Sequence, residues 1–355
     1  MEIKEITDSK EYRPHDLAAD CHLTQAWFYG DWQKERERKV KRFGAFTDKN
    51  SLFNDAGQKM PVAFWQVVKI PLPFEQNFLY IPHGPVAKNT DETFWLEFSR
   101  QMKELAREEK SVFSRFDSFP PEKNPPYAKL FYKATPESYR SSSFQPTSEW
   151  ILDISQSNEN ILAGMHPNHR RSIRAAEKNG VEIKIFRETN LGEGFDVFWK
   201  LMRETAERAE FRLHEKKYYE NIFSYPARES AGRRTEIKAD LFVAEYQKKV
   251  LAAHLLIYFG QTAFFLFGGS AREHANMMPT QLAHWRAMQE ARARGCKFYN
   301  FGAVAGRRQT SSQSLEGVSK FKQKFGGFLQ EYGDFHDIIS HPWRYKIYNW
   351  YKKFK

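Results

Sequence analysis

Apolar residues recur along this chain in two periods, and each period predicts one kind of element. Residues 264–267 form a short apolar run that ends at two glycines, which predicts a strand followed by a loop. From Pro279 apolar residues recur at helical spacing as far as Gly295, and residues 298–301 are again typical of a strand. A strand, a helix and a second strand in this order predict a crossover unit, with a ligand site in the loop after the first strand.

The same patterns predict the other elements. We expect a helical or turn-rich opening at residues 17–33, and a Pro/Ser-rich connector at 118–149. Strands are expected at residues 40–46, 62–70, 78–81, 112–116, 150–154, 181–186, 241–245, 250–258 and 262–267. Helices are expected from Asp91 as N-cap, in two stretches ending at Lys178, and at residues 195–209, 217–224 and 280–293.

This order of elements occurs twice. Residues 17–116 and the second half both read as helices, three hairpin-linked strands, a helix and a strand. The repetition predicts an α/β protein made of two copies of one unit, in the order of the acyltransferase fold of N-acetyltransferases. We expect a first domain at 1–149, completed by the C-terminal segment 330–355, and a second domain at 150–329.

Composition narrows the classes of protein that fit. A net charge of +11 in 355 residues favours an anionic partner such as nucleic acid, a phosphorylated substrate or an acidic membrane surface. Two cysteines exclude a disulfide framework, and His166 and His169 have metal-ligand spacing without an evident third ligand. We therefore expect no metal site. No secretory signal or stretch of about 20 apolar residues is present, so we expect a soluble cytoplasmic protein.

Six stretches together carry a family resemblance. They lie, in order, at residues 24–33, 80–86, 165–180, 267–270, 298–302 and 317–327. With these motifs the chain resembles the Fem family of peptidoglycan bridge-forming aminoacyltransferases, which have a tandem GNAT-like acyltransferase fold. The resemblance implies transfer of an amino acid from aminoacyl-tRNA to the stem-peptide amine of UDP-MurNAc-pentapeptide or of lipid II. Both substrates are polyanions, which suits the basic charge; a monomer without a further cofactor is expected.

The pair Phe321–Lys322 is the first catalytic candidate. Attack of an amine on the tRNA ester forms a tetrahedral oxyanion, which a fixed cation and a backbone N–H would stabilise. The resemblance places a Phe-Lys pair with this role in the sequence FKQKFGG. A basic amphipathic helix that packs Phe321 and Phe325 inward is the structural alternative.

Asp117 is the second catalytic candidate, because it follows the strand predicted at 112–116. A carboxylate there could accept the proton of the attacking amine or position the acceptor, and the resemblance implies such a role. A turn-initiating aspartate is the structural alternative. His83 lies in a separate turn-forming sequence, HGP, whose loop is expected to face the acceptor; a plain strand end is the structural alternative.

Several residues are expected to bind substrate. Arg170, Arg174 and Lys178 fall on one helix face, which would meet phosphates or simply be solvated. The resemblance further implies His214 and Tyr218 at the acceptor's UDP and sugar, with His214 where many members carry arginine. Gln33 and Ser270 lie in the first and fourth of the matching stretches and are expected to bind substrate as well.

The C-terminal segment 341–355 interleaves aromatic and cationic residues. This composition suits an interfacial helix at an anionic membrane, so peripheral association with the inner face is one expectation. A terminal helix docked on the first domain is the alternative. The chain also lacks room for the helical arm of some Fem proteins, which makes it resemble the compact members associated with the UDP-linked acceptor.

Two other functions fit the composition. An acyl-CoA-dependent N-acyltransferase would need a glycine-rich loop for the pyrophosphate, but residues 270–279 contain no glycine and end in a proline. A basic RNA-binding module would suit the charge and the aromatic content, but no RNA-recognition signature is present.

Overall fold

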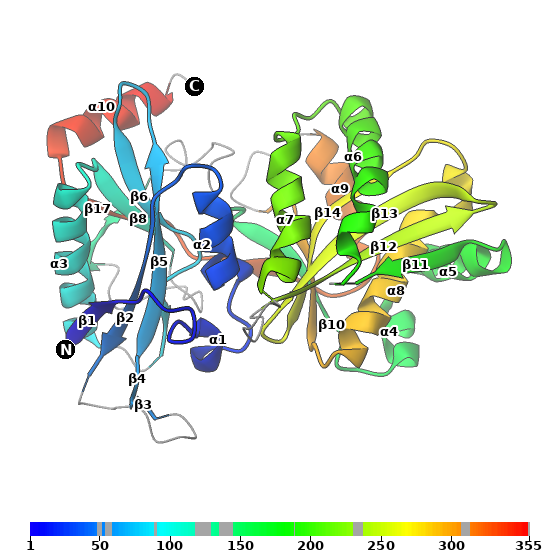
Figure 1. Cartoon of the computed structure of the whole chain (residues 1–355), viewed down its shortest axis with the longest axis horizontal. Coiled ribbons are helices and arrows are strands. Elements are labelled where there is room, and N and C mark those ends of the chain that lie inside the picture. The colour runs from blue at the N-terminus through cyan, green and yellow to red at the C-terminus, as the bar shows by residue number, and fades with distance from the viewer. Residues whose placement is uncertain are drawn as a thin grey trace. The chain divides into compact units, whose positions relative to one another are not determined.

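The computed structural model describes residues 1–47, 52–53, 59–88, 91–117, 129–134, 145–187, 189–229, 237–306 and 313–353. The chain divides into two compact units. Unit 1 comprises Met1–Thr147 and Glu331–Lys355, and unit 2 comprises Ser148–Gln330. Each unit contains one main sheet with helices packed against it (Figure 1).

Unit 1 is built on a sheet with the strand order β1-β2-β5-β6-β8-β17-β9. These strands are β1 (Glu2–Glu5), β2 (Val40–Phe46), β5 (Ala63–Pro71), β6 (Asn77–Ile81), β8 (Phe113–Phe116), β17 (His336–Ile339) and β9 (Tyr132–Lys133). The short β7 (Val86–Ala87) pairs with β5, and β3 (Leu52–Phe53) pairs with β4 (Lys59–Met60). The helices are α1 (Pro14–Leu17), the 3-10 turn η1 (Leu23–Gln25), α2 (Trp27–Lys34), α3 (Glu92–Glu108) and α10 (Pro342–Lys353).

The helix α3 covers one face of this sheet, and α2 lies on the other (Figure 1). Helix α3 begins where expected, because the Asp91 side chain accepts a hydrogen bond from Phe94 N at 3.0 Å. Its apolar face buries Phe94, Phe98 and Met102 against Trp65 of β5, which is fully buried. This packing forms the core of unit 1.

Unit 2 has a sheet with the strand order β11-β12-β13-β14-β15-β10-β16. Its strands are β10 (Ser148–Asp153), β11 (Glu182–Phe186), β12 (Lys238–Tyr246), β13 (Lys249–Phe259), β14 (Thr262–Ser270), β15 (Phe298–Ala303) and β16 (Phe328–Glu331). Its helices are α4 (Asn158–Gly164), α5 (Pro167–Lys178), η4 (Leu191–Gly194), α6 (Phe195–Ala209), α7 (Lys216–Glu229), η5 (Ala275–Met277), α8 (Pro279–Ala293) and α9 (Gln313–Gln323).

The central strands of unit 2 are buried on both faces. Helix α6 packs on one side of β13 and β14, and α8 on the other (Figure 1). This explains why β13 is a nearly continuous apolar run and not an alternating one. At Gly269 the sheet approaches α6 so closely that an added Cβ would lie 2.5 Å from the carbonyl carbon of Leu201.

Both units share one connectivity, which confirms the repeated order predicted from the sequence. Three antiparallel strands are followed by a helix and a strand parallel to the third; the parallel pairs are β6–β8 and β14–β15. The predicted crossover unit is therefore β14–α8–β15. The next strand has a different origin in each unit: β17, from the C-terminal segment, pairs with β8, whereas β10, from the start of unit 2, pairs with β15.

The sequence patterns missed the short strands β1, β9, β16 and β17. Each has four residues or fewer, and β1 reads EIKE with only partial burial. Such segments have little apolar pattern of their own and become strands by pairing with a longer neighbour. The connector expected at 118–149 lies mostly outside the described residues.

Candidate active site

Lys322 lies near the end of α9 with its side chain buried in unit 2. Its Nζ donates a hydrogen bond to the backbone oxygen of Ala303, the last residue of β15, at 2.7 Å. Gly302, just before it, has a φ of +75°, a conformation that favours glycine. The final strand of the crossover therefore holds the ammonium group in place.

Burial and charge set the chemistry of this lysine. Burial lowers the pKa of Lys322 to about 8, and the nearby Glu149 carboxylate opposes that shift. The same carboxylate accepts a hydrogen bond from Asn300 Nδ2 at 2.6 Å, and Asn300 Oδ1 accepts one from the N–H of Gly302, also at 2.6 Å. Glu149 thus supports both the charge of Lys322 and the backbone beside it.

Phe321 packs against the core of unit 2. It lies within α9, where N–H groups beyond the first turn donate to the preceding turn. Its ring is 5.1 Å from that of His169 and 5.4 Å from that of Phe325, which is fully buried. The inward packing of both phenylalanines, expected as the structural alternative, coexists with a buried Lys322.

Two buried histidines near this lysine were missed by the sequence analysis. The rings of His254 and His284 lie 4.2 Å apart, and His284 Nδ1 is 2.9 Å from the hydroxyl of Tyr299. Burial lowers the pKa of His254 to about 3; burial, followed by the charges of His254 and Lys322, lowers that of His284 well below its usual value. Both rings are therefore neutral at pH 7. The available signal was one polar residue, His254, within the apolar run of β13.

The pair His166 and His169 does not converge on a common point. His166 is exposed and caps α5 by accepting a hydrogen bond from Asn168 N, whereas His169 is buried against Phe321 and Phe325. In the part of the chain that the structure describes, no group of three or more His, Cys, Asp or Glu side chains is arranged to hold a metal.

In unit 1 the structure brings together two of the predicted site residues. His83 Nδ1 lies 2.5 Å from Asp117 Oδ2, and the backbone N–H of His83 donates to Oδ1 at 2.8 Å. Both side chains are almost completely buried. Asp117 therefore fixes the turn at His83, whose φ is +49°, and its carboxylate lies too deep for direct contact with bulk water.

Two of the matching stretches meet around this pair. Thr24 Oγ1 and Gln25 Nε2 both donate to the backbone oxygen of Pro82, at 2.9 and 2.7 Å. The His83 ring stacks on Tyr332 with centroids 3.8 Å apart, and His22 packs against it edge-on. The motifs at residues 24–33 and 80–86 thus form one polar cluster within unit 1.

Two predicted substrate ligands, Gln33 and Arg170, make hydrogen bonds within the protein. Gln33 is buried, and its Oε1 accepts a hydrogen bond from Arg38 at 2.6 Å. Arg170 Nη1 donates to the backbone oxygens of Leu162, Ala163 and Met165, which terminate α4 and the segment after it. Arg174, one turn further along α5, is exposed and keeps its side chain available to a ligand.

The remaining predicted substrate ligands are His214, Tyr218 and Ser270, which lie around the C-terminal end of β14. The ring of His214 lies 4.1 Å from that of Tyr218, which in turn packs edge-on against Phe267. Ser270 ends β14, and Arg208 of α6 donates to its hydroxyl and its backbone oxygen at 3.1 and 3.0 Å. Arg208 is a further cation at this place that the sequence analysis did not select.

Comparisons with known proteins bear on this arrangement. The sequence model of the FemAB family matches residues 132–231 and 226–353, which together make up more than half of the chain. The chain belongs to the FemAB family.

Several relatives of this FemAB protein match nearly its whole length. A lipid II:glycine glycyltransferase of Staphylococcus haemolyticus is 22% identical, and the match covers 96% of this chain and 94% of the relative. A solved structure of FemX, 18% identical, superposes with a TM-score of 0.77 over 98% of this chain and all of that one. A tandem GNAT protein from the clavulanic acid biosynthesis pathway, 10% identical, gives a TM-score of 0.52 over 96% of this chain and 98% of its own. The fold is therefore a tandem GNAT-like α/β fold.

The sequence contains no stretch of about 20 apolar residues that would predict a membrane span. None of the helices in the described part of the chain has the length and apolar character that a bilayer span requires.

Proposed function

We propose that this FemAB protein is an aminoacyltransferase that moves an amino acid from aminoacyl-tRNA to the stem-peptide amine of a peptidoglycan precursor. Membership of the FemAB family supports this reaction class. Full-length relatives named lipid II:glycine glycyltransferase support transfer of an amino acid to a cell-wall precursor. The tRNA donor is the finer part of the proposal, and the net charge of +11 suits it.

The buried ammonium of Lys322 is the observation that carries the mechanism. The attacking amine adds to the ester carbonyl carbon of the donor and forms a C–N bond, while the carbonyl oxygen becomes an oxyanion. An ammonium has three donors, and among the described residues Ala303 O takes one of them, which leaves donors that can bind the oxyanion. The C–O bond of the ester then breaks; the amine loses a proton and the tRNA hydroxyl gains one.

The acceptor is a UDP-linked or a lipid-linked stem peptide. The names of the relatives favour the lipid-linked form. The short connection between α7, which ends at Glu229, and β12, which begins at Lys238, leaves no room for a helical arm, and this compact arrangement favours the UDP-linked form. Both acceptors contain a diphosphate, and exposed cations such as Arg174 suit either.

The decisive experiment is an incubation with a pool of charged tRNAs and each acceptor in turn, followed by mass measurement of the acceptor. We expect a mass gain of one or more aminoacyl residues with one of the two acceptors. No gain with either acceptor, or acetylation when acetyl coenzyme A replaces the tRNA, would overturn the proposal.

A matched pair of variants tests the role of the lysine. Lys322→Met removes the buried cation, whereas Lys320→Met removes an exposed cation from the same helix. Loss of a single oxyanion donor typically costs a factor of about 100 to 1,000 in kcat. We expect such a loss for Lys322→Met only; equal rates in the two variants would remove Lys322 from the mechanism.

A further inference from the structure

The C-terminal helix α10 has a buried face that holds it on unit 1. Tyr345 and Tyr348 are both buried, and their rings pack against Phe113 of β8. The hydroxyl of Tyr345 donates to Asp337 Oδ2 of β17 at 2.6 Å. The helix is therefore docked on its own unit, as one of the two expectations had it, and only its other face is available to a partner.

That other face is apolar. Trp343, Ile347 and Trp350 recur at positions i, i+4 and i+7, and they are 60%, 53% and 64% exposed. Large apolar side chains clustered in water mark an interaction surface. The docking of α10 through its tyrosines thus leaves its most hydrophobic residues outside.

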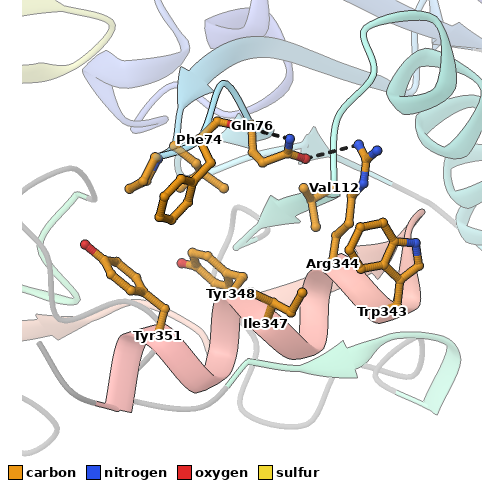
Figure 2. A pocket seen from close by; sticks show the side chains of 10 residues that line it. Phe74, Gln76, Val112, Trp343, Arg344, Ile347, Tyr348 and Tyr351 are labelled. Carbon is orange, nitrogen blue, oxygen red and sulfur yellow. Dashed lines mark hydrogen bonds between the residues drawn. The ribbon is translucent and has the colours of Figure 1, made fainter.

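A hairpin tip extends this apolar surface. Phe74, between β5 and β6, is 85% exposed, the highest exposure among the large apolar residues described. Its φ of +59° lies in the left-handed region, which is uncommon for residues other than glycine. Figure 2 shows Phe74 facing Tyr348 and Tyr351 across a pocket between the hairpin and α10. The volume of this pocket is about 300 Å³. Arg344 Nη1 donates to Gln76 Oε1 at 3.1 Å and ties the helix to the hairpin.

The charged side chains of α10 are all positive. Helix α10 carries Arg344, Lys346, Lys352 and Lys353 and no acidic residue. At the hairpin tip the acidic residue Glu75 directly follows Phe74. Cations among aromatic side chains are typical of helices that lie in the headgroup region of an anionic bilayer.

We propose that α10 and the Phe74 hairpin form a docking surface for an anionic lipid bilayer. Trp343, Ile347, Trp350 and Phe74 enter the boundary between headgroups and acyl chains, and the pocket receives hydrocarbon. The lysines contact the phosphates.

Two other occupants fit this surface less well. A second copy of the chain would place the same patch on both sides of a two-fold interface, so the cations of one α10 would face those of the other. A protein partner is disfavoured because lysine is depleted in protein interfaces, whereas three lysines belong to this short helix.

Docking on a bilayer is a property separate from the proposed aminoacyl transfer. It is measured by vesicle binding, without tRNA or acceptor. We expect the full chain to float with vesicles made of equal parts phosphatidylglycerol and phosphatidylcholine, and not with phosphatidylcholine alone. Trp343 and Trp350 are the two tryptophans among the exposed large apolar residues, so brominated lipid should quench part of the tryptophan emission.

Matched variants test the surface itself. Ile347→Ser is expected to weaken vesicle binding, and Trp343→Ser with Trp350→Ser to abolish flotation. Leu96→Ser, at the equally exposed residue of α3, should leave binding unchanged. Lys346→Gln should weaken binding about fivefold, as expected for one cation near an anionic surface. Circular dichroism verifies that each variant is folded.

Three outcomes would overturn the proposal. The first is absence of flotation with phosphatidylglycerol vesicles at low salt. The second is equal binding by Ile347→Ser and Leu96→Ser. The third is a dimer in sedimentation velocity that Ile347→Ser dissociates, because this result would assign the surface to a second copy. Aminoacyl transfer to a UDP-linked acceptor needs no bilayer, so a failure of docking is distinguishable from a failure of the proposed function.

Discussion

His83 and Asp117 form a buried pair in which Nδ1 of the ring is 2.5 Å from Oδ2 of the carboxylate. The backbone N–H of His83 donates to the other carboxylate oxygen at 2.8 Å. Asp117 thus fixes both the ring and the backbone of His83. The sequence predicts that Asp117 accepts the proton of the attacking amine or positions the acceptor, and that His83 binds substrate; in the structure the two side chains contact each other.

Asp117→Asn is expected to destabilise unit 1. The amide can accept only one of the two hydrogen bonds in the present geometry, and an unsatisfied buried group costs about 1–3 kcal/mol. Urea unfolding should show this loss for Asp117→Asn and no change for Asp20→Asn, at an exposed aspartate of the same unit. An unchanged free energy of unfolding together with lost transfer would instead support a direct role in proton transfer.

Lys322→Met is expected to stabilise the fold at neutral pH. Burial lowers the pKa of Lys322 from 10.5 to about 8. Since one pKa unit corresponds to about 1.4 kcal/mol, the buried charge costs about 3 kcal/mol below pH 8. The lost bond to Ala303 and the loss of the cation beside the buried Glu149 offset much of this gain, so we expect the free energy of unfolding to rise by only about 1 kcal/mol.

The stabilisation by Lys322→Met should also depend on pH. Between pH 8 and 10.5 the folded wild-type lysine is neutral while the unfolded chain is still protonated, so wild-type stability rises with pH. The difference between variant and wild type should therefore shrink across this window. A constant difference from pH 7 to 10 would show that the lysine is not desolvated.

Transfer activity is expected to fall above about pH 8. Stabilisation of the oxyanion needs the ammonium form of Lys322, which is lost as pH rises through its pKa of about 8. The rate profile of kcat should have its descending limb there. In Lys322→Arg any remaining activity should keep its rate to higher pH, because a guanidinium stays charged. Coincident descending limbs would assign this limb to another group.

Arg170→Met and Arg174→Met are expected to differ although the two residues lie on one face of α5. Arg170 donates to three backbone oxygens at the end of α4, so its loss should lower the free energy of unfolding by about 1–2 kcal/mol. The exposed Arg174 should leave stability unchanged and raise the KM for an anionic substrate. Equal stability losses would contradict this division.

Gly269→Ala is expected to destabilise unit 2. The added Cβ would lie 2.5–2.7 Å from backbone atoms of Leu201 and Met202, which cannot move without shifting α6. Overpacking of this kind typically costs about 1–3 kcal/mol. Gly192→Ala is the control, because its Cβ would meet nothing within 4 Å. Thermal unfolding should separate the two variants.

Local pattern was sufficient for most of the elements. The range 195–209 was predicted from its amphipathic period and is α6, and the strand predicted at 40–46 is β2. These elements are predictable because each buries one face of its own sequence. By contrast, β17 has little pattern and becomes a strand by pairing with β8.

The chain by itself determined the repeated α/β order, the cationic character and the position of Lys322 in a basic helix. Only the tertiary structure decided which polar groups meet. Glu149 and Asn300 are 151 residues apart, and Arg115 pairs with Asp337 across 222 residues. The spacing of residues along a chain predicts only contacts within a few turns of one helix. Contacts between residues this far apart in sequence depend on which strands pair. For the same reason the sequence pointed to an aromatic, basic C-terminus, but only packing showed which of its faces is buried.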